Sequence, residues 1–351
     1  MTSFFTGVGV IFSLELRQRV RGVAWYVLLG VFVVLIGIVT LLLTFAFNGF
    51  GMGSPSSGAG GGIYSTIIYF VLLLGTLVAP ALSGNAINGD RDAGTLATTQ
   101  ITLITTWQLV VGKFLAAWVT ALAFLVAALP FIVISALLGG LSPVTVLVSA
   151  LVLAVELGVV AAIGVGLSGI LSRSLFSIVV SYLVVACLSV GTLIAFVLGG
   201  IAVQTTTSNT YVGGVDFDTD GQAITCSAPQ TSTRSTPRFD LFWGVLVANP
   251  YVLLADAVPT TYDERDNPDD LFGSIKYEVR SAQIPPTDTV YNECEPQTED
   301  APTARERIDS TVPGWFVGLF IHVILAVGAL FWARARTDTP AGRLPRGSRV
   351  A

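Results

Sequence analysis

Two ionisable residues stand inside long apolar stretches of this sequence. Glu156 lies near the middle of Val144–Leu171, and His322 lies within Trp315–Ala333. A charged side chain in hydrocarbon is costly, so an ionisable residue in such a place is a candidate functional group. At about 1.5 Å of rise per helical residue, the two side chains fall within about 10 Å of each other in depth. That depth permits a pair, either as a structural contact or as a proton site.

A serine in the same stretch suggests a different chemistry. The segment Gly166-Leu167-Ser168-Gly169, taken with His322, resembles the catalytic serine and histidine of rhomboid intramembrane proteases. Counted along the helices, however, the two side chains fall some 25 Å apart in depth, whereas proton transfer needs about 3 Å. Small residues in an apolar helix more often permit close helix packing. The protease is therefore the less favoured alternative.

An acidic stretch has the spacing of a calcium loop. The segment Asp216-Phe217-Asp218-Thr219-Asp220-Gly221 alternates carboxylates and ends in glycine. Its twelfth position is Ser227, where a bidentate glutamate is expected. A hairpin turn rich in Asp and Gly explains the same letters, so no metal site is assigned to Asp216, Asp218 and Asp220, and calcium binding stays open.

Long apolar helices must position these residues. Of 351 residues 53% are hydrophobic and 12% are charged, with a mean hydropathy of +0.75, whereas about a quarter of an ordinary soluble domain is charged. About 20 apolar residues cross a bilayer as a helix. We therefore predict an all-α integral membrane protein. Its six spans are Trp25–Phe47, Ile63–Ile87, Phe114–Leu138, Val144–Leu171, Leu175–Val203 and Trp315–Ala333.

The basic residues predict the orientation, because Lys and Arg in short loops stay in the cytoplasm. Outside residues 204–312 every basic residue falls on one side of the six-span arrangement. We therefore expect a plasma-membrane protein with both termini in the cytoplasm. The basic residues on this side are Arg17, Arg19, Arg21, Arg91, Lys113, Arg173, Arg334, Arg336, Arg343, Arg346 and Arg349.

This arrangement divides the chain into four parts. Residues 1–203 hold an N-terminal helix and five spans, 204–312 form a large extracytoplasmic domain, 313–336 are the sixth span, and 337–351 are a basic cytoplasmic tail. The outer domain carries 18 acidic and 7 basic residues, and alternation in Ile275–Val279 predicts a short strand. The apolar run Leu241–Ala255 is too short to be a span and is broken at Asn249-Pro250, which favours a pair of half-helices.

The cysteines fit the same division. Cys226 and Cys294 lie in the expected outer domain, and Cys187 lies in the fifth span. Disulfides persist outside the cytoplasm. We therefore expect a Cys226–Cys294 disulfide.

The loop between the second and third spans carries the most informative motif. It reads Asn88-Gly89-Asp90-Arg91-Asp92-Ala93-Gly94-Thr95-Leu96 and ends in Trp107-Gln108-Leu109-Val110-Val111-Gly112-Lys113. This loop resembles that of type-two ABC transporter permeases, which have acidic-Arg-acidic-x-Gly-Thr-Leu, with Glu commoner than Asp, and an aromatic or basic residue before Gly-Lys. The segment Glu15-Leu16-Arg17-Gln18-Arg19-Val20-Arg21 is similar to their amphipathic connecting helix, and Asn249-Pro250-Tyr251 to a stretch before the last span in some members.

The resemblance implies roles for named residues. Asp90, Arg91, Asp92, Gly94, Thr95, Trp107 and Lys113 would form the loop that couples the permease to its ATPase, and Glu15, Arg17, Arg19 and Arg21 would belong to the connecting helix. The alternative for the charge run is that it only solvates a loop. The length of the outer domain departs from the family pattern.

The chain lacks a phosphate-binding loop, because Gly112-Lys113 is followed by Phe114. An ATPase in a separate subunit is therefore expected to bind ATP and Mg, and this chain is not expected to be an enzyme or to hold a cofactor. The resemblance implies two ATPase copies and a second permease copy. It also implies export of an amphiphilic or hydrophobic compound, such as a drug, lipid or glycoconjugate, by alternating access. Membrane lipid is an expected partner and nucleic acid is not. A proton-coupled carrier using Glu156 is the alternative from another class.

Overall fold

The computed structural model describes residues 4–49, 59–96, 104–217, 223–294 and 302–338. Within these residues, six helical stretches are long and apolar enough to cross a membrane, which confirms the predicted number of spans and indicates a multi-pass membrane protein. The stretches are Val23–Ala46, Gly60–Asp92, Thr106–Leu137, Pro143–Ile170, Ser174–Ala202 and Trp315–Thr337.

A short helix precedes the spans, and the fifth span is interrupted by a π-helical turn, η1. The helices of this part are α1 (Phe4–Val20), α2 (Val23–Gly49), α3 (Ala59–Ser83), α4 (Asn88–Asp92), α6 (Thr106–Leu138), α7 (Pro143–Ile170), α8 (Ser174–Ala186), η1 (Cys187–Gly191), α9 (Thr192–Ala202) and α14 (Trp315–Thr337).

The helix starts follow local capping rules. The Ser142 side chain accepts a hydrogen bond from the backbone N–H of Thr145, and Pro143 occupies the first turn of α7. Thr105 and Gln108 form a reciprocal capping box at the start of α6. Gly140, at φ +60°, lies in the turn between α6 and α7, where a side chain would be strained. Polar residues between the apolar stretches thus fix where these helices begin.

Small residues let α7 and α14 pack closely. A Cβ atom placed on Gly166 would lie 2.6 Å from the Cβ of Ala329, and one placed on Gly169 would lie 2.7 Å from the Cβ of Ala333. Neither position has room for a larger side chain. The glycines around Ser168 therefore serve helix packing, as small residues do in membrane helices.

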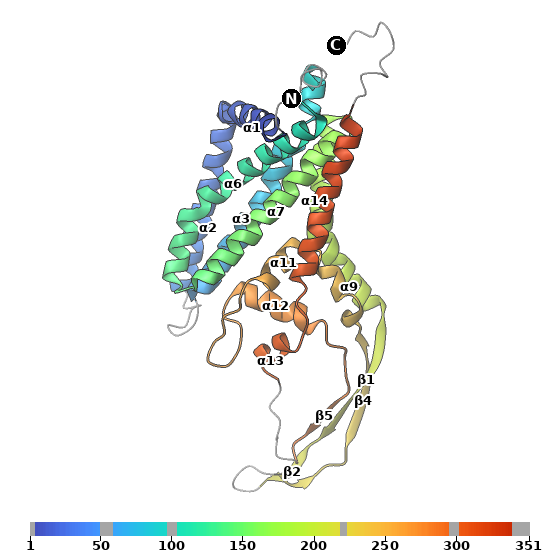
Figure 1. Cartoon of the computed structure of the whole chain (residues 1–351). Coiled ribbons are helices and arrows are strands. Elements are labelled where there is room, and N and C mark those ends of the chain that lie inside the picture. Colours follow the sequence, from blue (N-terminus) through green and yellow to red (C-terminus); the bar gives the residue numbers. More distant parts are fainter. Residues whose placement is uncertain (1–3, 50–58, 97–103, 218–222, 295–301, 339–351) are drawn as a thin grey trace.

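The two ends of the bundle differ (Figure 1). α1 and the C-terminal part of α14 lie at one end, which we call the terminal end. The described parts of residues 204–312, called the inserted region, extend from the opposite end, which we call the domain end. This arrangement is the one that six crossings produce.

The inserted region combines helices with two small sheets. Strands β4, β1 and β5 form one sheet in that order, with β1 antiparallel to β4 and parallel to β5, and β2 pairs with β3. Its elements are β1 (Gln204–Val212), β2 (Gly214–Phe217), β3 (Ala223–Cys226), β4 (Gln230–Pro237), η2 (Phe239–Leu241), α10 (Trp243–Leu246), α11 (Pro250–Ala257), α12 (Leu271–Ser281), β5 (Thr289–Asn292) and α13 (Ala304–Asp309).

The helices α11 and α12 share the core of the bundle. Leu254 and Phe272 are fully buried in the same apolar cluster as Ile67 and Leu72 of α3. The backbone N–H of Leu271 also donates to the Ser65 hydroxyl, 3.1 Å away. The strands instead project away from the bundle (Figure 1). The helical part of the inserted region is therefore anchored to the spans.

The prediction of a strand at Ile275–Val279 is wrong, because these residues belong to α12. Asp270 caps this helix by accepting from the backbone N–H of Gly273, and burial raises the pKa of its carboxyl group to about 6. The buried positions Phe272, Lys276 and Arg280 are four residues apart, as one face of a helix requires. Two of them are charged, so the pattern of apolar residues in the sequence did not indicate which face of this segment is buried.

The break predicted within Leu241–Ala255 is present. α10 ends at Leu246 and α11 begins at Pro250, with Asn249 as its N-cap. Proline lacks a backbone N–H and is favoured in the first turn of a helix. The run therefore forms two short helices.

The expected disulfide is also present. Cys226 and Cys294 are bonded, with their Cα atoms 6.1 Å apart. The bond joins the end of β3 to the segment after β5, so it links the two sheets.

This disulfide gives the first prediction. Because it closes 68 residues of chain, it should stabilise the inserted region by roughly 4 kcal/mol on the chain-entropy account. Mass spectrometry of the unreduced protein should find the Cys226 and Cys294 peptides joined, and the double Ser variant should be digested faster between the strands. Recovery of both cysteines freely alkylated from unreduced protein would contradict it.

Candidate functional site

Glu156 and His322 meet inside the bundle. Nδ1 of His322 lies 2.9 Å from each carboxyl oxygen of Glu156, and both side chains are at most 2% exposed. The other ring nitrogen, Nε2, lies 2.9 Å from the carbonyl oxygen of Ala248. A backbone carbonyl only accepts, so Nε2 carries a hydrogen and donates to Ala248. One proton then joins Nδ1 to the carboxyl group.

The pair connects α7 and α14 to the turn between α10 and α11. In this turn the side-chain oxygen Oδ1 of Asn249 accepts from the backbone N–H groups of Tyr251 and Val252. Its amide nitrogen donates to the Ser189 carbonyl oxygen at 2.6 Å and to the Thr192 hydroxyl at 2.9 Å. Ser189 lies in η1, where the π-helical turn interrupts the α-helical hydrogen-bond pattern. Spans five and six therefore bond to one short turn, and span four is joined to it through His322.

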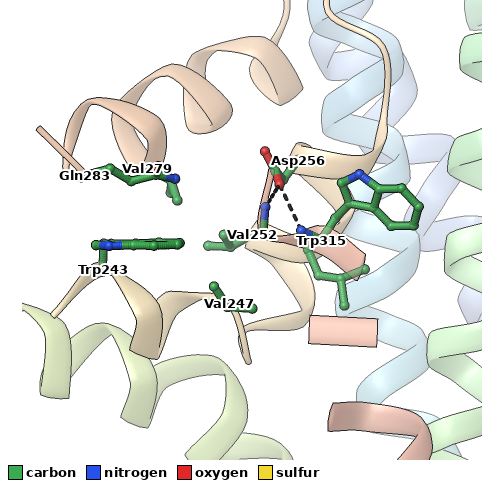
Figure 2. Close-up of a pocket in the computed structure, with 9 residues that line it drawn as sticks. Trp243, Val247, Val252, Asp256, Val279, Gln283 and Trp315 are labelled. Carbon is green, nitrogen blue, oxygen red and sulfur yellow. Dashed lines mark hydrogen bonds between the residues drawn. The ribbon is translucent and has the colours of Figure 1, made fainter. Parts of the chain in front are cut away.

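The other end of α11 bonds to the start of the sixth span. Figure 2 shows Asp256 beside the first residues of α14. Its Oδ2 accepts from the backbone N–H groups of Gly314 and Trp315 at 2.7 and 2.9 Å, and its Oδ1 accepts from Nε of Arg280 at 2.7 Å. A carboxylate suits a helix N-terminus, which carries unpaired N–H groups and partial positive charge. The cavity drawn in Figure 2 has a volume of about 10 Å³, enough for about one water molecule.

A second cluster lies at the terminal end, and we call it the terminal-end network. Nζ of Lys113 forms an ion pair with Glu15 of α1 and another with Asp90 of α4, at 2.7 Å from its Oδ2. The Lys113 side chain is 2% exposed. Arg19 lies 4.0 Å from Glu15 and adds a second positive charge. A buried ammonium group is tolerated only when paired, so Lys113 holds α1, α4 and α6 together.

The glycine before Lys113 serves the same contact. A Cβ atom on Gly112 would lie 2.7 Å from the Cβ of Ile11, so only glycine lets α1 lie this close to α6. Gly94 has φ +69° and forms the turn after α4. At both positions of the permease-like loop motif, the backbone therefore requires glycine.

Arg91 points into the protein. Its Nη1 donates to Asn88 Oδ1 at 2.6 Å and to the Leu171 carbonyl oxygen at 2.9 Å. Ser168 bonds nearby, where its hydroxyl accepts from the backbone N–H groups of Ile87 and Asn88. These contacts join α4 to the end of α7. Ser168 and His322 thus have different partners, and the structure does not bring them together as a catalytic pair.

The other predicted site residues lie around this network. The Trp107 ring contacts Phe331 edge-on, with centroids 4.7 Å apart, and Arg334 lies over it at 5.3 Å. The Thr95 hydroxyl donates to the Asp90 carbonyl oxygen. Asp92, Thr95, Arg17 and Arg21 are exposed. The structure therefore places the loop and connecting-helix residues at one end, with a paired interior and a charged surface.

The structure describes only part of the segment for which calcium binding was considered. Asp218 and Asp220 lie outside the described residues. Among the residues that are described, no group of three His, Cys, Asp or Glu side chains could hold a metal ion. Calcium binding by Asp216, Asp218 and Asp220 therefore stays a hypothesis from the sequence.

Sequence reasoning missed four groups that bond elements together. Ser168 was considered only as a protease nucleophile or a small packing residue, Asn88 gave no recognisable signal, and the Ala248 carbonyl is a backbone atom. The sequence did contain a signal for Asp256, because a single acidic residue directly follows an apolar run. No model of a known protein family matches the chain, and no curated protein sequence matches it. The site therefore has to be interpreted from its geometry.

The buried pair gives the second prediction. Replacing Glu156 with Leu leaves Nδ1 of His322 without a partner, which should cost about 3–5 kcal/mol of stability. Gln keeps a hydrogen bond, because its amide can donate to Nδ1 while Nε2 still donates to Ala248, so it should cost only about 1 kcal/mol. Equilibrium unfolding in mixed micelles, followed by tryptophan fluorescence, measures both. Equal stability of the Leu and Gln variants would show that the pair is not the stabilising contact.

Proposed function

We propose that this chain is the membrane subunit of an ATP-driven exporter, and that its terminal end docks a separate ATPase on the cytoplasmic side. The terminal-end network carries the proposal. Lys113 binds together the helix and the loop that resemble the connecting helix and coupling loop of type-two ABC permeases. If this loop served only to expose charged residues to water, it would not need an ion pair with a buried lysine.

The arrangement suits a docking surface. Asp90 and Arg91 are bonded into the protein, whereas Asp92 next to them is exposed. Arg17 and Arg21 of the α1 region are exposed at the same end. A partner that pushed on Asp92 would therefore move a segment tied to three helices. Asp90 pairs with Lys113 of α6, which also pairs with Glu15 of α1, and Arg91 bonds to the end of α7. Rigid packing allows such a push to shift whole helices.

Transport then follows from two copies of this chain. ATP-driven closure of two ATPase subunits would move the terminal ends and open a path to the other side for an amphiphilic or hydrophobic substrate. In the most apolar stretch of α2, and in that of the fifth span, only 11% of the residues are buried inside the protein. The corresponding share is 61% for Gly60–Asp92 and for Pro143–Ile170. These exposed faces are available to lipid and to the second copy.

The proton-coupled carrier remains the competing function, and Glu156 distinguishes the two. In an exporter, the bonds of Glu156 and His322 hold spans and the inserted region together, and transport by the Glu156→Gln variant stays dependent on ATP. In a carrier, the isolated chain would accumulate substrate under a pH gradient without ATP, and the same variant would lose that accumulation. The second result would overturn the exporter.

The third prediction tests docking at Asp92. Reversing its charge by Asp92→Arg should lower both recovery of the ATPase with the tagged chain and ATP hydrolysis in vesicles about tenfold or more, since mismatched charges at an interface cost several kcal/mol. Asp92 is preferable to Arg91, whose reversal would also remove the bond to the Leu171 carbonyl.

A matched control keeps the result specific. Glu264→Arg makes the same charge change at an exposed position of the inserted region and should leave both readouts unchanged. Equal activity of the Asp92→Arg and Glu264→Arg proteins, at equal amounts in the membrane, would count against docking at this loop.

A further inference from the structure

A large hollow lies between the fifth span and the inserted region. Its volume is about 1180 Å³, whereas sites for drug-sized ligands run from roughly 300 to 1000 Å³. One wall comes from η1 and α9, and the other from α11, α12 and the start of α13. It is therefore large enough for a whole amphiphilic molecule.

The wall from the fifth span is apolar. Val190, Leu193 and Val197 line it with side chains that are 44–55% exposed. Aliphatic side chains that wall a hollow favour a ligand with an apolar body, because ligand sites are lined mainly by apolar groups that pack against the ligand. The ring of Phe196 extends this wall. The occupant should therefore carry a substantial apolar body.

The opposite wall carries the charge. Glu278 is the only charged residue among the described residues that line the hollow, and it is exposed. Among the ion pairs formed by described residues, none involves Glu278. Its basic neighbours on α12 are used elsewhere, since Lys276 donates to the Val258 carbonyl and Arg280 pairs with Asp256. The hollow thus presents an uncompensated carboxylate.

Aromatic rings complete the site. Tyr277 lies next to Glu278 on α12, and Tyr251 of α11 and Phe239 of η2 also line the hollow. Aromatic faces attract cations, and more strongly where water is partly excluded. A carboxylate with aromatic rings therefore favours an organic cation over an anion or a neutral molecule of the same shape.

We propose that this hollow binds an amphiphilic organic cation, with its apolar body against Val190, Leu193 and Val197 and its positive charge near Glu278. As the substrate class of the exporter, this assignment rests on the proposed function. As a binding site, it does not, because binding needs neither the ATPase nor ATP.

The fourth prediction uses tetraphenylphosphonium as the probe. The purified full chain in nanodiscs of zwitterionic lipid should bind it saturably, at one site per chain, in equilibrium dialysis. Glu278→Gln should weaken binding about three- to tenfold, in line with an attraction of about 1 kcal/mol at a partly exposed site. Tetraphenylborate, an anion of the same shape, should bind more weakly than the cation to the unmodified chain, and the difference should shrink in this variant.

Two further variants make the result decisive. Glu264→Gln removes an exposed carboxylate that does not line the hollow and should leave binding unchanged. Val197→Trp should project a bulky ring into the hollow at the apolar wall and reduce binding of both probes. No saturable binding to the unmodified chain, or equal effects of Glu278→Gln and Glu264→Gln, would overturn the proposal. If binding is as expected but the Asp92→Arg experiment shows no ATPase docking, this site stands and only the exporter is refuted.

Discussion

The contact of His322 with Glu156 and with the Ala248 carbonyl organises the domain end of this protein. An ionisable group in an apolar interior must be paired, because leaving it alone costs several kcal/mol. Here the pairing draws α7, α14 and the α10–α11 turn to one point. The bonds of Asn249 then bring η1 of the fifth span to the same turn. The inserted region is thereby fixed to three spans by a few polar atoms.

The same constraint operates at the terminal end. Lys113 is buried, and Glu15 and Asp90 approach it from two other elements to form ion pairs. Beside this network Arg91 bonds to the end of α7, and α7 packs on α14 through Gly166 and Gly169. Both ends of the bundle are thus tied to one rigid pair of helices. This is the physical basis for proposing that a push at Asp92 moves whole helices.

Much of the fold was predictable because its cause is local. The spans follow from apolar length and bilayer thickness, and the break before α11 follows from Asn249-Pro250. The α12 helix was not predictable in this way, since its buried face uses Lys276 and Arg280, whose charges are satisfied by a carbonyl and by Asp256. Depth allowed Glu156 and His322 to pair, but their rotation about the helix axes depends on packing. The sequence also left Glu15 and Lys113 in separate motifs, and only the fold showed that they are one contact.

The central claim is that an ATPase docks beside Asp92, and site-specific photo-crosslinking tests it most directly. A photoreactive residue placed at Asp92 in the full chain, in its native membrane, should capture a polypeptide that mass spectrometry identifies as containing a phosphate-binding loop. The same residue placed at Leu241, which is 56% exposed and lies in the inserted region, should not capture it. Failure to capture an ATPase at Asp92, or capture of the same ATPase at Leu241, would contradict the account.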